Sequence, residues 1–141
     1  MAAFVAEHFV AFQANVNVPA ERAAFRRFGA IWTPSIVILN SDGIEQHRIE
    51  GFLPAREFHA QLMLALARIL AVRKRWVEAE PQYTAIVDRF GDTAAAAEAL
   101  YWRGVAAYQG RRDHDALVRM AAEMQQRYPS SEWAIKSAVW L

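Results

Sequence analysis

The side chains able to do chemistry are scattered along this chain rather than grouped into a recognisable site. The four histidines stand far apart, at His8, His47, His59 and His114. A metal site needs three or four converging ligands, and no histidine or carboxylate recurs here at a ligand spacing. Ser35 and Ser41 have no evident base that would activate a nucleophile, and the isolated glycines form no phosphate-binding loop. We therefore expect no catalytic residue, no metal and no cofactor.

Composition narrows the function classes further. The chain has no cysteine, which excludes disulfides, thiolate catalysis and thiolate metal ligands. Its formal charge of +1 gives no electrostatic reason to expect a nucleic acid or a membrane surface as partner. No apolar run approaches the ~20 residues of a membrane span, and no signal peptide is visible. We expect a cytoplasmic protein, or a periplasmic one if the true start lies upstream with a signal peptide.

The first elements of the chain are short. Residues 2–8 favour a helix. Residues 9–16 alternate between apolar and polar side chains with the period of two that is typical of a strand. Pro19 suits the first turn of a second helix that runs to about Phe28, and Gly29 is a suitable stop for it.

A hairpin and a longer helix follow. Residues 35–40 are apolar on both faces, which predicts a strand inside a sheet with helices above and below. Asp42 and Gly43 predict a tight turn, and residues 44–49 return as a more polar partner strand. Residues 54–72 then carry apolar side chains at helical spacing.

These features, in this order, resemble the second half of a thioredoxin fold. The resemblance rests on Thr33-Pro34 before the apolar strand, on the Asp-Gly hairpin, and on Gly51 before the closing helix. It implies that Pro34 is the proline that is cis in the family. It also implies that Trp32, Thr33 and Pro34 line a groove that accepts an extended peptide. The Cys-x-x-Cys pair and the front half of the family's fold are missing from this chain.

The missing front half includes the strand that is central in the family's sheet. Its neighbours would be the strand at residues 9–16 and the strand at residues 35–40. A buried, unpaired backbone group costs about 1–3 kcal/mol, and a domain is only ~5–15 kcal/mol stable. Three outcomes remain open: the strands pair differently, a second copy of the chain covers the edge, or the chain is a fragment with an upstream start.

The remainder of the chain reads as helices separated by short breaks. We expect helices at residues 76–90, 94–108, 113–128 and 132–141. An internal repeat relates them, because Ala79 and Tyr83 match Ala116 and Met120 at one constant spacing. In each repeat the alanine (Ala79 or Ala116) suits a close helix crossing, and the larger residue four positions later (Tyr83 or Met120) fills the groove beside it.

This pattern resembles the tetratricopeptide repeat, with Gly104 and Ala116 as the small residues at the crossing. It also resembles the longer-spaced variant of bacterial cell-envelope assembly proteins, through the segments AEALYWRGVAAYQG and RYPSSEWA. The packing residues that the resemblance implies are Ala79, Tyr83, Gly104, Ala116 and Met120. Because no polar capping helix follows, we expect an exposed apolar face at the end of the array.

Together these observations predict a mixed α/β protein. A truncated thioredoxin-like unit of about three strands, residues 1–72, continues into a tetratricopeptide-like α-helical hairpin array, residues 60–141. The helix at about residues 55–72 would be shared between them. We expect a non-catalytic protein–protein interaction module, a homodimer that also binds a protein or peptide. The alternative is a member or fragment of a thiol-disulfide oxidoreductase or chaperone-like thioredoxin that lacks its redox cysteines.

Overall fold

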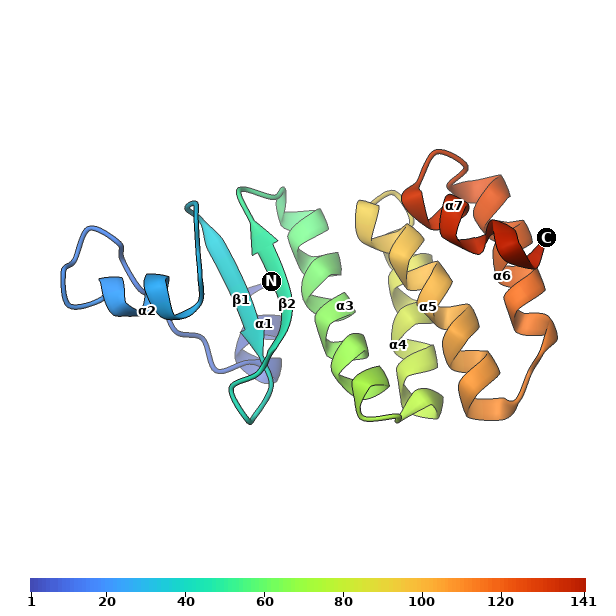
Figure 1. Cartoon of the computed structure of the whole chain (residues 1–141), viewed down its shortest axis with the longest axis horizontal. Helices are drawn as coiled ribbons and strands as arrows, with labels where there is room; N and C mark the ends of the chain where they lie inside the picture. Colours follow the sequence, from blue (N-terminus) through green and yellow to red (C-terminus); the bar gives the residue numbers. More distant parts are fainter. The chain divides into compact units, whose positions relative to one another are not determined.

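The computed structural model describes all of residues 1–141 and divides the chain into two compact units. The first unit is Met1–Ala55 and the second is Arg56–Leu141. The first contains two short helices and a β-hairpin, and the second is entirely helical (Figure 1). The fold is therefore mixed α/β, with most of its regular structure in helices.

The first unit is built around the hairpin. Helices α1 (Ala2–His8) and α2 (Arg22–Arg27) precede strands β1 (Ser35–Leu39) and β2 (Glu45–Glu50). The strands are antiparallel, with Ile36 opposite Ile49. One extra residue of β2 forms a bulge opposite the step from Ile38 to Leu39. The hairpin, its turn and both helices lie where the sequence predicts them, although α2 is shorter than expected.

The turn of the hairpin is held by one side chain. The Asn40 carboxamide oxygen accepts hydrogen bonds from the backbone N–H groups of Asp42 and Ile44, at 2.9 and 3.0 Å. Gly43 has a φ of +75°, a left-handed conformation that glycine adopts without steric cost. The turn chemistry therefore fixes the pairing of Leu39 with Glu45, and the bulge shifts the register by one residue beyond it.

The predicted strand at residues 9–16 is wrong. These residues are not part of any strand, and the sheet contains only β1 and β2. Val10 and Phe12 are almost fully exposed, at 101% and 81%. Alternating side chains favour a strand only when a partner supplies a hydrogen-bonding ladder, and no partner lies beside this segment. The count of about three strands falls to two for the same reason.

The expectation that β1 lies inside a sheet is also wrong, because β1 has a strand on one side only. Two backbone bonds, Gly51 N–H to the Pro34 carbonyl and Asn40 N–H to the Ile44 carbonyl, fix which residues face β2. Along an antiparallel pair, the backbone groups of successive residues point alternately toward the partner strand and away from it, so Ile36 and Ile38 bond to β2. The backbone groups of Ser35, Val37 and Leu39 point away from β2, and none of them has a backbone hydrogen bond within the chain.

The second unit is a run of antiparallel helices (Figure 1). Its helices are α3 (Ala55–Val72), α4 (Trp76–Arg89), α5 (Ala94–Arg111), α6 (Asp115–Arg127), α7 (Glu132–Ser137) and the 3-10 turn η1 (Ala138–Trp140). The sequence predicts each of these helices to within a few residues. None of the helices is long and apolar enough to cross a lipid bilayer.

Helix α5 forms the centre of this unit, packed against α4 and α6. Its buried residues lie on several sides of the helix rather than on one stripe, and they are mostly alanines (Ala95, Ala96, Ala97, Ala99, Leu100, Gly104, Ala106 and Ala107). A helix that is buried on several sides is contacted by more than one neighbour. Small side chains keep α5 thin, which allows the helices on both sides to approach closely.

Salt bridges and one helix cap join the helices of this unit. The Glu57 carboxylate of α3 accepts hydrogen bonds from the N–H groups of Ala94 and Ala95, at 2.8 and 3.2 Å. These are the first two N–H groups of α5, which lack partners inside the helix. Arg56 forms a bidentate pair with Asp92 in the preceding loop. The start of α3 therefore holds the start of α5.

Candidate functional site

The loop between α2 and β1 carries the residues that the sequence singles out for peptide binding. Helix α2 ends at Arg27, and Gly29 follows with a φ of +59°. The N–H of Ala30 bonds to the carbonyl of Phe25 at 3.0 Å, which closes the end of the helix. This left-handed residue turns the chain away from the helix axis and directs residues 30–34 toward the start of β1.

Residues 32–35 are held by local hydrogen bonds. The Ser35 hydroxyl donates to the Trp32 carbonyl at 2.6 Å, and the Gly51 N–H donates to the Pro34 carbonyl at 2.8 Å. The Thr33–Pro34 peptide bond is cis. The hydrogen bond between Gly51 and Pro34 extends the ladder of the hairpin by one pair, so the segment before β1 is bonded to the segment after β2.

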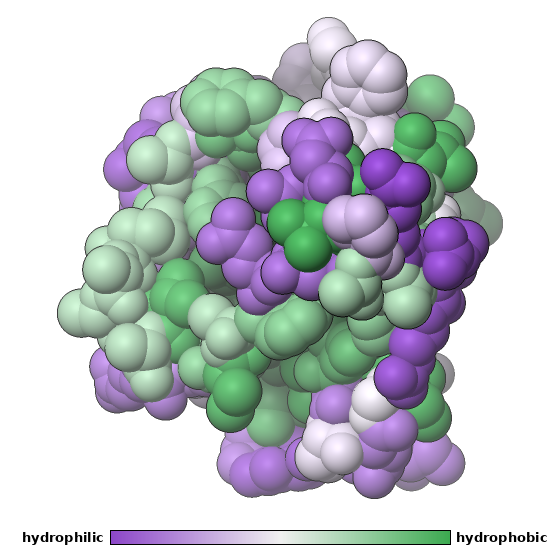
Figure 2. All heavy atoms as spheres, turned by 90° about the vertical axis from the view of Figure 1, so that its left-hand side faces the viewer, coloured by the Kyte–Doolittle hydropathy of each residue, from purple (hydrophilic) through white to green (hydrophobic).

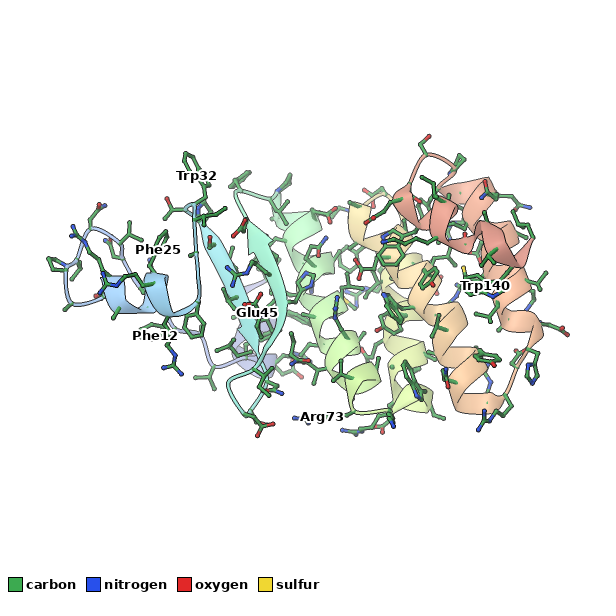
Figure 3. All side chains as sticks on the ribbon, viewed as in Figure 1. Phe12, Phe25, Trp32, Glu45, Arg73 and Trp140 are labelled. Atoms are coloured by element: carbon green, nitrogen blue, oxygen red, sulfur yellow. The ribbon has the colours of Figure 1, made fainter.

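Four apolar residues lie in the segments that flank this end of the hairpin, and we call them the ledge: Ile31, Trp32, Pro34 and Phe52. Ile31, Trp32 and Phe52 are 79%, 68% and 83% exposed. The hairpin register that pairs Pro34 with Gly51 places Phe52 opposite the residue next to Trp32. Figure 3 shows Trp32 projecting from the loop, away from the hairpin. None of these side chains titrates, so the ledge offers apolar contact and no acid–base chemistry.

The sequence predicts Trp32, Thr33 and Pro34 at this site and misses Ile31 and Phe52. The position of Phe52 depends on a bulge that the sequence pattern does not reveal. Counting outward from the turn, where Leu39 lies opposite Glu45, would place Gly51 opposite Thr33, but the extra residue of the bulge shifts the register so that Gly51 bonds to Pro34. Ile31 carries no comparable signal, because its exposure depends on the path of a loop.

Exposed hydrophobic groups also occur elsewhere on this unit. Figure 2 shows hydrophobic atoms among hydrophilic ones on the surface that forms the left-hand side of Figure 1. Val10 and Phe12 are among the most exposed apolar residues of the chain. Single exposed apolar residues are normal on a protein surface, so it is the adjacency of the ledge residues at one end of the hairpin that makes them a candidate.

Charged residues lie on β2 rather than on the ledge. Arg48 pairs with Glu45 at 2.6 Å and donates a hydrogen bond to the carbonyl of Phe28 just after α2. The hydrogen bond from Arg48 lowers the pKa of Glu45 below its ordinary value. Through its bond to Phe28, Arg48 links the end of α2 to the hairpin. The four ledge residues themselves carry no charge.

The residues predicted to pack the helical repeat are all buried. Ala79 and Tyr83 of α4 are 0% and 1% exposed, and Ala116 and Met120 of α6 are 5% and 2% exposed. Gly104 of α5 faces Met120 so closely that an added Cβ would lie 2.6 Å from the Met120 Cβ. The structure therefore brings Gly104, Ala116 and Met120 together where α5 crosses α6. Burial raises the pKa of Tyr83, whose side chain belongs to the core.

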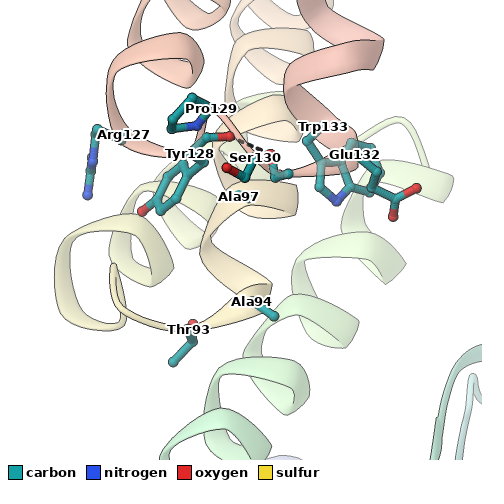
Figure 4. Close-up of a pocket in the computed structure, with 10 residues that line it drawn as sticks. Thr93, Ala94, Ala97, Arg127, Tyr128, Pro129, Ser130, Glu132 and Trp133 are labelled. Carbon is teal, nitrogen blue, oxygen red and sulfur yellow. Dashed lines mark hydrogen bonds between the residues drawn. The ribbon is translucent and has the colours of Figure 1, made fainter.

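A hollow of about 510 Å³ lies between the start of α5 and the loop before α7 (Figure 4). Its polar groups are already engaged. The Tyr128 hydroxyl donates to the Gly91 carbonyl at 2.9 Å, and the Thr93 hydroxyl donates to the Phe90 carbonyl at 2.6 Å. Arg127 bonds to Glu123 and to the carbonyl of Val87. Since these groups hold the loop in place, the hollow has little free capacity to recognise a polar ligand.

The end of the helical unit carries an aromatic cluster. Tyr101 and Trp102 of α5 contact Trp133 of α7, with ring centroids 5.0 and 6.5 Å apart, and Tyr101 also contacts Trp140. Figure 3 labels Trp140 close to the end of the chain. The indole N–H of Trp102 is buried without a hydrogen-bond partner. Beyond this cluster, Ile135, Val139 and Leu141 are 70–80% exposed.

No group of three or more His, Asp or Glu side chains is gathered in a way that would hold a metal ion. In the comparison with protein families, the model of a thioredoxin-like domain matches residues 2–65. Residues 2–65 are therefore similar to a thioredoxin-like domain. No curated protein and no solved structure matches the chain.

The matched residues of the thioredoxin-like domain include the ledge, the hairpin and the first part of α3. The division into compact units falls earlier, between Ala55 and Arg56. Helix α3 (Ala55–Val72) thus begins within the residues that match the thioredoxin-like domain model and ends beyond them.

Proposed function

We propose that this chain is a non-catalytic protein-binding module whose thioredoxin-like domain holds an extended polypeptide at the ledge. The observation that carries the proposal is that Trp32 and Phe52, both largely exposed, flank the backbone hydrogen bond between Gly51 and Pro34 at one end of the hairpin. Aromatic side chains supply much of the binding energy in protein interfaces because they bury a large apolar area at little cost in conformational entropy. The resemblance to thioredoxins implies the same location for a bound peptide.

This chain's own residues cannot carry out the thiol–disulfide exchange reaction of thioredoxins. Thiol–disulfide exchange requires a thiolate that attacks a disulfide sulfur, and the chain has no cysteine. The match to a thioredoxin-like domain does favour an origin among the thiol-disulfide oxidoreductases or chaperone-like thioredoxins. We infer that peptide binding is the part of their function that this chain retains.

The helical unit, in this proposal, is a tetratricopeptide-like scaffold that continues from the thioredoxin-like domain through α3. Two observations support it: the close crossing of α5 and α6 at Gly104, and the burial of Ala79 and Tyr83 in α4. We also propose that the chain self-associates as a homodimer. The exposed apolar side chains and the unpaired backbone groups of β1 support this part of the proposal.

The ledge is tested by measuring how an unfolded polypeptide binds to the full chain. Reduced, carboxymethylated lactalbumin carrying a fluorescent label is titrated with the wild-type chain and followed by fluorescence anisotropy. We expect Trp32→Ala and Phe52→Ala each to weaken binding by about tenfold, which corresponds to ~1.4 kcal/mol. Ile135→Ala, which removes an equally exposed apolar side chain from α7, is the matched control and should bind like the wild type.

Two results would contradict the proposal. One is equal binding by the wild type and both ledge variants, which would place the polypeptide elsewhere. The other is reduction of insulin disulfides by the purified chain in the absence of an added thiol, which would show a redox activity that we do not expect.

A further inference from the structure

The outer edge of β1 is the feature of this chain that most needs a partner. We use this name for the backbone N–H and C=O groups of Ser35, Val37 and Leu39, which point away from β2 and have no backbone hydrogen bond within the chain. The segment at residues 10–14 does not complete their hydrogen bonds, since it makes no backbone hydrogen bond with any part of the chain.

This edge also lacks the features that normally prevent strands from pairing with other chains. Natural edge strands carry charged side chains, an internal proline or a bulge that twists the strand away. The five residues of β1 are Ser, Ile, Val, Ile and Leu, with neither a charge nor a proline. Strand β2, in contrast, carries Glu45, Arg48 and Glu50 and contains the extra residue of the bulge. Only one of the two edges of the hairpin is unprotected.

We propose that the outer edge of β1 pairs with the same edge of a second copy of this chain, antiparallel and centred on Val37. This inference deepens the self-association in the proposed function by naming the surface and the register. A two-fold axis brings identical surfaces together, and an uncharged strand pairs with itself without repulsion between like charges.

The register follows from counting the hydrogen bonds that each alignment allows. When Val37 lies opposite Val37, Ser35 lies opposite Leu39 at both ends, and every outward-facing residue of β1 has a partner. When the two-fold axis passes through Ile36 or Ile38 instead, one outward-facing residue of each strand is left without a partner. The alignment centred on Val37 is therefore the one that satisfies the whole edge.

The faces of the sheet agree with this alignment. Residues directly opposite each other in an antiparallel pair lie on the same face. Ile36, Ile38 and Ile49 share one face of the hairpin, and the two-fold axis places the same face of both copies on the same side of a four-stranded sheet. Val37 lies beside its own copy on the other face, a pairing of β-branched residues that favours strands.

The two ledges remain available in this dimer. Ser35 directly follows Pro34 and lies opposite Leu39 of the second copy, so the ledges lie at opposite ends of the paired strands. Peptide binding at the ledge and pairing at β1 are therefore separate events, and each can be tested without the other.

The absence of cysteine makes the register testable by single substitutions. In the proposed dimer the two copies of residue 37 face each other, within the ~4.4–6.8 Å between Cα atoms that a disulfide spans. The two copies of residue 35 lie about 14 Å apart or more, given ~3.4 Å per residue. We expect Val37→Cys to form a disulfide-linked dimer under mild oxidation, whereas Ser35→Cys alone and Leu39→Cys alone do not.

A mixture of the Ser35→Cys chain with the Leu39→Cys chain should again give a linked dimer, because these positions face each other across the two copies. The mixture keeps Val37 intact, so it tests the register even if Val37→Cys fails to fold. Light scattering of the unmodified chain should give twice the mass of one chain.

Three outcomes would overturn the inference. A monomer at all concentrations, with no linkage in any variant, would show that the edge does not pair. Equal linkage in all variants would show unspecific association. A disulfide within one chain in the double variant Val37→Cys, Phe12→Cys would show that the chain's own residues 10–14 cover the edge. Trp32→Ala serves as the reference, because it should weaken polypeptide binding and leave the linkage at position 37 unchanged.

Discussion

The crossing of α5 and α6 at Gly104 gives a prediction whose magnitude follows from the structure. A Cβ atom at position 104 would lie 2.6 Å from the Cβ and 2.8 Å from the Cγ of Met120. Carbon atoms pack at about 3.5–4.0 Å, so the contact would be about 1 Å too short. The Met120 Cβ is bonded directly to the backbone of α6, and a rotamer change cannot move it away. The two helices would have to separate.

We expect Gly104→Ala to destabilise the helical unit despite improving its helix propensity. Inside a helix, alanine is more favourable than glycine by ~1 kcal/mol of stability. Overpacking of this kind costs about 1–3 kcal/mol, and forcing α5 away from α6 costs an amount near the upper end of that range. The net loss is then about 1–2 kcal/mol, which for a unit of this size lowers the melting temperature by roughly 4–15 °C. Urea and thermal unfolding followed by circular dichroism at 222 nm would measure it.

Gly110→Ala in the same helix is the matched control. Its Cβ would lie 3.1 Å from the Trp76 Cβ and 3.2 Å from the Val77 nitrogen, a tighter contact than usual but one that small shifts relieve. We expect this variant to be at least 1 kcal/mol more stable than Gly104→Ala, a difference set by the clash at position 104. A Gly104→Ala chain as stable as the wild type would refute the close crossing and the packing argument with it.

Three further predictions concern single contacts. Glu57→Ala removes the acceptor for the first two N–H groups of α5 and should lower the free energy of unfolding by ~1 kcal/mol, measured from the urea midpoint; an unchanged midpoint would show that water replaces the carboxylate at no cost. Burial raises the pKa of Glu123, but the charges and hydrogen bonds of Arg127 and Arg103 outweigh it and hold the pKa below 4.5. The stabilisation that ionised Glu123 contributes to the fold is therefore present above its unfolded-state pKa and is lost as the pH falls through its folded-state pKa. For Glu123→Gln, the free energy of unfolding should therefore depend less on pH below about pH 4.5 than it does for the wild type. Parallel pH profiles of the two proteins would contradict the assignment. Asn40→Ala removes two hydrogen bonds from the hairpin turn and should increase amide exchange in β1 and β2, whereas unchanged exchange would show that Gly43 suffices for the turn.

The helices and the hairpin were predictable because local signals determine them. The turn residues Asn40, Asp42 and Gly43 set the hairpin, and Gly29 ends α2 through a left-handed backbone conformation that a glycine readily supplies. The helical breaks before α4, α5 and α7 occur where the sequence places loop residues. Each of these signals acts over a few residues, so it can be read without knowing what the rest of the chain does.

The strand predicted at residues 9–16 failed because a strand is not a local structure. The alternation of side chains is present in the sequence, but a strand exists only where a neighbour completes its backbone hydrogen bonds. The same argument explains the open edge of β1, which reads as an interior strand from its apolar residues alone. The apolar pattern predicts which residues favour burial, and the available partners decide whether that burial occurs.

Part of the candidate site was predictable from the sequence, because its residues are consecutive in the chain. Trp32, Thr33 and Pro34 follow one another and precede an apolar strand, a pattern that resembles a known family. Phe52 joins them only through the register of the hairpin, and Ile31 only through the path of a loop. The packing of Gly104 against Met120 likewise required two helices to be placed side by side.

The sequence by itself determined the positions of the helices and of the hairpin turn, and it excluded thiol chemistry, because these depend on residue types and on contacts between near neighbours. Tertiary structure alone decided that the sheet has two strands, that Phe52 lies at the same end of the hairpin as Trp32, and that α5 and α6 cross closely enough to require glycine. Those properties depend on distances between residues that are far apart in the chain. No local pattern specifies such distances, because they result from how whole elements pack and from which backbone groups find a partner.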